Sequence, residues 1–91
     1  MAPELMKVLR VDEWPALPGG SAVYLIKGET VEEHPRWVTL KTTDAWKASL
    51  CQESQKAGRW VWVRWQESFK GDAWLRTVEP DTTKFQHDEA V

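Results

Sequence analysis

Apolar and polar residues alternate in several short runs along the chain, a pattern typical of half-buried strands. Four runs rich in β-branched and aromatic residues predict strands at 22–27, 37–41, 59–65 and 73–78. The alternation is clearest in residues 59–65. The polar connection 66–72 then predicts that the last two strands form a hairpin.

One segment has helical periodicity. We predict a helix over residues 44–57, because Thr43 or Asp44 can accept hydrogen bonds from the first free backbone N–H groups. Gly58 suits the position after the last helical residue, where a left-handed backbone is common. The apolar stripe expected to pack on the sheet consists of Trp46, Leu50 and Ala57.

The two ends of the chain are less patterned. Residues 5–11 are apolar with interleaved cations, which fits either a short strand or a helical turn, and Pro and Gly residues of a loop follow. Residues 84–91 are predicted to form a flexible tail. The order of elements predicts a single α+β domain over residues 1–83, with a mainly antiparallel sheet of about four strands (β-β-α-β-β) and one helix packed on one face.

The predicted strands have two different faces, because side chains alternate along a strand. One face is aliphatic, is bordered by Trp65 and Thr77, and would be covered by the helix; it comprises Val38, Leu40, Val61, Val63 and Leu75. Val78 falls on the opposite face. That face combines tryptophans with cations and is our candidate partner-binding surface: Trp37, Lys41, Trp60, Trp62, Arg64, Trp74 and Arg76.

A single helix cannot cover both faces, so two interpretations of the second face remain open. It is either a second core covered by residues 1–20, with arginines at its edge, or a partly open interaction surface. Trp and Arg are enriched in binding hot spots, and four open tryptophans would exceed the apolar patch that monomers usually expose.

Composition sharpens this picture in one respect. The 91 residues include seven tryptophans and have a net charge of −2. Six of the seven tryptophans lie in residues 36–78. The same segment contains eight Lys and Arg but only four Asp and Glu. A basic, tryptophan-rich centre therefore lies between acidic ends.

The residue types that carry chemistry are sparse. Cys51, His34 and His87 are far apart and lack zinc-ligand spacing, so we expect no metal, no cofactor and no enzymatic activity. A lone cysteine predicts a reducing, cytoplasmic location and a buried, inert thiol. No apolar run approaches the roughly 18 residues of a membrane span, so we expect no membrane partner.

These patterns predict a small non-enzymatic binding module. The first hypothesis is that the Trp- and Arg-rich face engages a protein partner, as an accessory or inhibitor protein would, or a second copy of the chain. The alternative is a nucleic-acid-binding module in which this face stacks bases and its cations contact phosphates.

Overall fold

The computed structural model describes residues 2–14, 18–20 and 22–82. Five strands and one helix follow one another as β1 (Glu4–Trp14), β2 (Val23–Thr30), β3 (Trp37–Thr42), α1 (Ala45–Ala57), β4 (Val61–Glu67) and β5 (Ala73–Pro80). The predicted helix and four predicted strands are present, with ends shifted by a few residues. The predicted tail at 84–91 lies outside the described residues.

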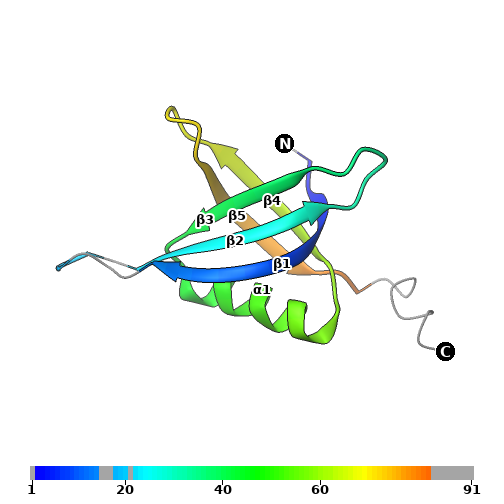
Figure 1. Cartoon of the computed structure of the whole chain (residues 1–91), viewed down its shortest axis with the longest axis horizontal. Helices are drawn as coiled ribbons and strands as arrows, with labels where there is room; N and C mark the ends of the chain where they lie inside the picture. Colours follow the sequence, from blue (N-terminus) through cyan, green and yellow to red (C-terminus); the bar gives the residue numbers. More distant parts are fainter. Residues whose placement is uncertain (1, 15–17, 21, 83–91) are drawn as a thin grey trace.

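The strands form a closed barrel in the order β1-β2-β3-β5-β4 (Figure 1). All neighbouring strands are antiparallel except β3 and β5, which run parallel. The predicted α+β domain with one helix and a mainly antiparallel sheet is present, but our expectation of about four strands was not exact. A fifth strand, β1, pairs with both β2 and β4 and closes the sheet into a barrel. The aliphatic face of the sheet is therefore the barrel interior.

Residues 5–11 form part of β1, the strand alternative of our prediction, and the helical turn is excluded; the sequence left the choice open because the alternation is interrupted. Met6 and Val8 point into the barrel and are buried. The register with β2 then shifts between Val8 and Arg10, so that Val11 is the next residue to pack against the core. Such a bulge breaks the two-residue period on which the prediction of a strand depends.

Gly28 allows β1 and β2 to approach closely beside this bulge. It pairs with Val8, and a Cβ built on it would lie 2.5 Å from Sδ of Met6 and 2.9 Å from the carbonyl oxygen of Lys7. Only a residue without a side chain fits this gap.

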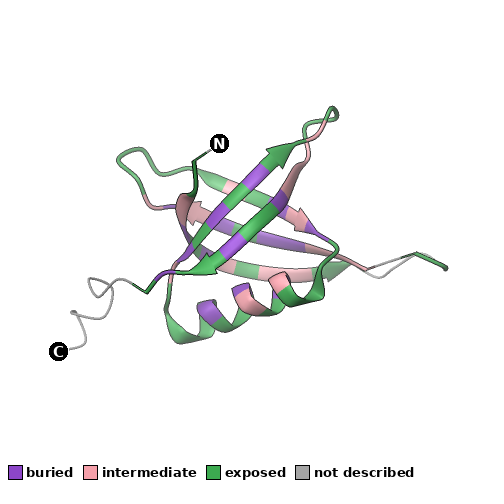
Figure 2. Cartoon of the chain, turned by 180° about the vertical axis from the view of Figure 1, so that it is seen from behind, coloured by how far each residue is buried: buried purple, intermediate pink, exposed green. Residues whose placement is uncertain are grey.

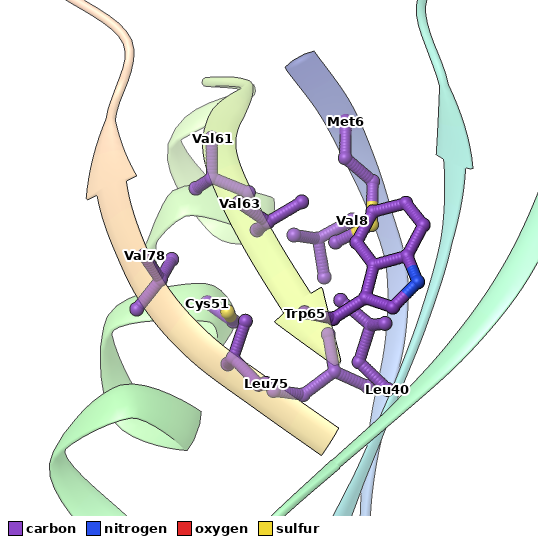
Figure 3. Close-up of a cluster of buried hydrophobic side chains, with 10 residues drawn as sticks. Met6, Val8, Leu40, Cys51, Val61, Val63, Trp65, Leu75 and Val78 are labelled. Atoms are coloured by element: carbon purple, nitrogen blue, oxygen red, sulfur yellow. The ribbon is translucent and has the colours of Figure 1, made fainter. Parts of the chain in front are cut away.

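The barrel interior is filled by side chains from every strand (Figure 3). Its fully buried members include Met6, Ile26, Leu40, Val61 and Val63. Buried and exposed residues alternate along β4, as predicted (Figure 2).

α1 lies beneath the barrel and contacts β1, β2, β3 and β5 (Figure 1). The predicted caps are confirmed: Asp44 accepts from the backbone N–H of Trp46, and Gly58 has φ of 69°. The predicted contact stripe was wrong at two of its three positions: Leu50 is partly buried against the core, but Trp46 and Ala57 are not. Trp46 is 63% exposed and Ala57 is exposed, whereas the smaller Ala48, Cys51 and Ser54 are buried and so let the helix pack closely.

The face assignment of β5 also needs correction. Arg64 pairs with Thr77, but the next residue of β4, Trp65, pairs with Leu75, so Arg76 is an extra residue. The parity of β5 reverses at this bulge. As a result Thr77 is exposed and Val78 is buried, the opposite of our prediction.

Candidate functional site

The seven predicted partner-binding residues do not form one patch. On β3, Trp37 and Lys41 face outward, and Lys41 pairs with Trp74 of β5. Trp62 and Arg64 face outward on β4, which lies beyond β5 in the barrel. Closure of the barrel therefore divides the predicted face into two groups.

The residues on and near β4 make more contacts with the rest of the barrel than Trp37 does. The indole nitrogen of Trp62 donates to Oδ1 of Asp81 at 3.3 Å, and Trp62 pairs with Leu5 of β1. Trp60 precedes β4 and is partly buried, and the Arg76 guanidinium is hydrogen-bonded to Gln66. These contacts favour a structural role for this side of the barrel.

A groove opens on the other side, where β3 and β5 separate. Only two residue pairs, Leu40–Ala73 and Lys41–Trp74, join these strands. Beyond them lies a groove of about 420 Å³ between β3 and the β4–β5 loop. We call this the β3 groove; the residues lining it are Arg36, Trp37, Val38, Thr39, Lys41, Trp65, Glu67, Gly71, Asp72 and Ala73.

Two indoles give the β3 groove its aromatic character. Trp65 lies among the core side chains (Figure 3) and is 6% exposed. It also lines the groove, and so forms a fixed wall there. Trp37 is 79% exposed on the outer face of β3. A planar ligand could therefore contact Trp37 without any rearrangement of the barrel.

Arg36 stands over Trp65, with its guanidinium carbon 6.0 Å from the ring centroid. Its Nη2 donates to Glu4 at 2.9 Å, and its Nε donates to Glu32 at 3.3 Å. The hydrogen bond and the negative charge of Glu4 raise the pKa of Arg36. The guanidinium is thus charged and held in place at one end of the groove.

Lys41 connects the groove to the end of β1. Its Nζ lies 2.9 Å from Oδ1 of Asp72 and 5.7 Å from the centroid of the Trp14 ring. Leu25, in the intervening strand, faces outward with Lys41 yet is only 7% exposed. Lys41 and Trp14 thus approach each other from the two strands that flank β2.

The β4–β5 loop carries a further aromatic residue away from the barrel (Figure 1). The backbone N–H of Ser68 donates to the carbonyl of Asp72, and the hydroxyl of Ser68 accepts from two backbone N–H groups of the loop. Phe69 is fully exposed in this hydrogen-bonded turn. The loop therefore presents Phe69 and Lys70 to solvent next to the groove.

Several groups of the site were not predicted: Trp14, Arg36, Trp65 and Phe69. An aromatic residue inside a polar turn, Ser68-Phe69-Lys70-Gly71, is a signal that could have identified Phe69. No local signal could place Trp14 near Lys41, because the pairing of β1 with β2 is not marked in the local sequence.

The rest of the described molecule offers little chemistry. Burial raises the pKa of the Cys51 thiol to about 12, which keeps it protonated and unreactive. Within residues 2–14, 18–20 and 22–82 there is no group of three His, Cys, Asp or Glu placed to hold a metal ion. No helix in the described part is long and apolar enough to cross a membrane. The cytoplasmic location and the lack of enzymatic activity stay predictions.

Comparison with protein-family models, with curated proteins and with solved structures finds no match.

Proposed function

We propose that this protein binds single-stranded nucleic acid along the β3 groove. The observation that carries the proposal is the exposure of Trp37, 79% of whose surface is open beside a groove walled by a second indole, Trp65. Indoles on a rigid sheet are stacking surfaces for unpaired bases, and each stacked base contributes about 1–3 kcal/mol.

The strand order adds an independent argument. Five-stranded barrels of the OB type have the connectivity seen here, and they bind oligonucleotides and oligosaccharides on strands 2 and 3 and on the loops that follow strands 1 and 4. Trp37 and Lys41 lie on β3, Phe69 lies in the β4–β5 loop, and Trp14 ends β1. A shared fold alone does not establish function, so the residues must carry the argument.

The charges beside the groove favour an oligonucleotide. Arg36 and Lys41 line it, Lys70 lies in the adjoining loop, and Lys27 is exposed on the outer face of β2 in register with Thr39. A chain whose bases stack on Trp37 would have its phosphates near these cations, while Glu29, which pairs with Trp37 from β2, adds one negative charge beside the indole.

A binding assay with a matched pair of variants tests the proposal. A fluorescein-labelled single-stranded DNA of nine thymidines is titrated with wild-type protein, Trp37→Ala and Trp46→Ala. Trp46 is a similarly exposed tryptophan on α1, away from the groove. Loss of one stacked base lowers affinity by about fivefold or more, so we expect that loss for Trp37→Ala alone. Thermal melting of both variants should match the wild type.

The result that would overturn the proposal is also specific. If neither single-stranded DNA nor RNA binds at low salt, or if Trp46→Ala weakens binding as much as Trp37→Ala, the groove is not a nucleic-acid site.

A protein partner, including a second copy of the chain, is the second candidate function. The observation that favours it is that the groove cations already have carboxylate neighbours: Arg36 pairs with Glu4 and Glu32, and Lys41 pairs with Asp72. A surface that is neutralised in this way suits apolar anchors such as Trp37 and Phe69. Salt separates the two candidates, because nucleic-acid affinity falls steeply with added salt and apolar association does not.

A further inference from the structure

Glu67 has an unusual position at the mouth of the barrel. It follows Trp65 by two residues on β4, so both side chains lie on the inner face of that strand. Trp65 is buried and Glu67 is exposed; Glu67 lies at the end of β4, four residues beyond Val63, the last residue of β4 that pairs with β1. A carboxylate therefore stands next to the indole wall of the β3 groove.

The groove has a second carboxylate, Asp72, which already has a hydrogen-bonding partner. Asp72 is held by Lys41 at 2.9 Å. Within the part of the chain that the structure describes, the side chain of Glu67 makes no hydrogen bond or ion pair, although its backbone pairs with Ala73 of β5. Its two oxygens, which can only accept hydrogen bonds, are thus available to a ligand in the groove.

A free carboxylate in the groove determines which part of a nucleotide can enter. It repels phosphate, so the backbone must stay on the outer side, near Lys27 and Lys70, while a base edge points toward Glu67. A base that stacks on Trp37 would present its Watson–Crick edge inward, which is the edge that proteins read on unpaired bases.

From this geometry we infer that the β3 groove prefers guanine, with the N1–H and N2–H groups of the base donating to the two oxygens of Glu67. The inference rests on the proposed function. Guanine alone among the common bases has two adjacent donors on its Watson–Crick edge. Thymine and uracil flank their single N–H with carbonyl oxygens that repel a carboxylate, while adenine and cytosine pair one amino group with a ring nitrogen acceptor.

The test compares nine-residue single-stranded DNAs that differ only in the central base, which is thymine, guanine or hypoxanthine between flanking thymidines. A bidentate pair discriminates by about 1–3 kcal/mol, so we expect guanine to raise affinity by about fivefold or more over thymine. Hypoxanthine keeps N1–H but lacks the N2 amino group, and it should recover only part of this gain.

Two variants assign the preference to one side chain. Glu67→Gln should reduce the guanine preference to less than twofold while the affinity for nine thymidines stays the same or rises. Glu79→Gln is the matched control, since Glu79 is an exposed carboxylate on β5 beside Trp62, outside the β3 groove. It should leave the preference unchanged.

The outcomes separate the two proposals. Equal affinity for the thymine and guanine oligonucleotides overturns the guanine inference and leaves nucleic-acid binding in place. A guanine preference that survives Glu67→Gln also overturns the inference. If no oligonucleotide binds, the proposed function itself fails.

Discussion

The Nζ of Lys41 lies 2.9 Å from Oδ1 of Asp72, so one ion pair connects β3 to the end of the β4–β5 loop. The pair is partly exposed and contributes about 0.2–1 kcal/mol at most to the free energy of unfolding. Its importance is positional, because it holds together the two sides of the β3 groove.

We predict that Lys41→Met keeps the stability but weakens nucleic-acid binding. The methionine retains most of the apolar stem and loses the charge, so the slope of log affinity against log salt should fall by about 1. Titrations of a single-stranded oligonucleotide at several salt concentrations measure this slope. Lys56→Met, at an exposed position near the end of α1, is the control, and an equal change there would argue against a local role for Lys41.

A second prediction concerns Gly28. Gly28→Ala would place a methyl group 2.5 Å from Sδ of the fully buried Met6, which cannot retreat without disturbing the core. Overpacking of this kind costs about 1–3 kcal/mol, which urea unfolding can measure. Combining it with Met6→Val should recover part of the loss. Wild-type stability of the single variant would mean that the two strands can move apart at little cost.

The third prediction contrasts Val63, which is buried as the sequence predicted, with Trp46, which was predicted to pack on the sheet but is exposed. Val63→Ala removes fully buried methyl groups and should lower the free energy of unfolding by about 1–3 kcal/mol. Trp46→Ala, despite the larger truncation, should change it by only about 0.5 kcal/mol, because the indole is mostly exposed on α1. A large loss of thermal stability for Trp46→Ala would restore the helix stripe that we first predicted.

Cys51 gives a prediction for alkaline pH. Its pKa is about 12 in the folded chain against an ordinary value of 9.0, because burial penalises the thiolate. The unfolded chain therefore loses this proton first, and the thiol's contribution to stability, complete below about pH 9, declines as the pH rises toward 12.

The measurement is the free energy of unfolding from pH 8 to pH 11 in wild type and in Cys51→Ala. The wild type should lose stability faster above pH 9, and the difference between the two slopes isolates the thiol from other groups that titrate there. In the native protein at pH 8, a thiol reagent should react only after denaturant is added. Rapid reaction would contradict the burial of Cys51.

The parts of the fold that were predictable follow strictly local rules. The alternation of Val61, Val63 and Trp65 predicted which side of β4 is buried, and Asp44 and Gly58 marked the ends of α1. β1 stayed undecided between a strand and a helical turn because its bulge at residues 8–10 hides the alternation, and Thr77 was misplaced because of a second bulge in β5. Bulges depend on the partner strand, which the local sequence does not identify.

The site was only partly predictable for a related reason. Trp37 and Lys41 were correctly expected to face away from the core. Whether they share a surface with Trp62 depends on how the sheet closes, and the barrel places β5 between them. Likewise, only closure brings Arg36 over Trp65, so sequence parity alone could not indicate the groove.

The two residue pairs between β3 and β5 act as a clasp. The clasp joins the three-stranded meander β1–β3 to the β4–β5 hairpin. On the opposite side of the barrel the same two parts are joined by the pairing of Glu4–Met6 with Val61–Val63, which we call the hinge. Opening the clasp breaks few hydrogen bonds, so amide protons near Leu40 and Ala73 should exchange through such opening sooner than those of the hinge. A ligand lying in the groove touches both halves and holds the clasp shut, and its binding would then appear as slower hydrogen exchange at residues that it never contacts.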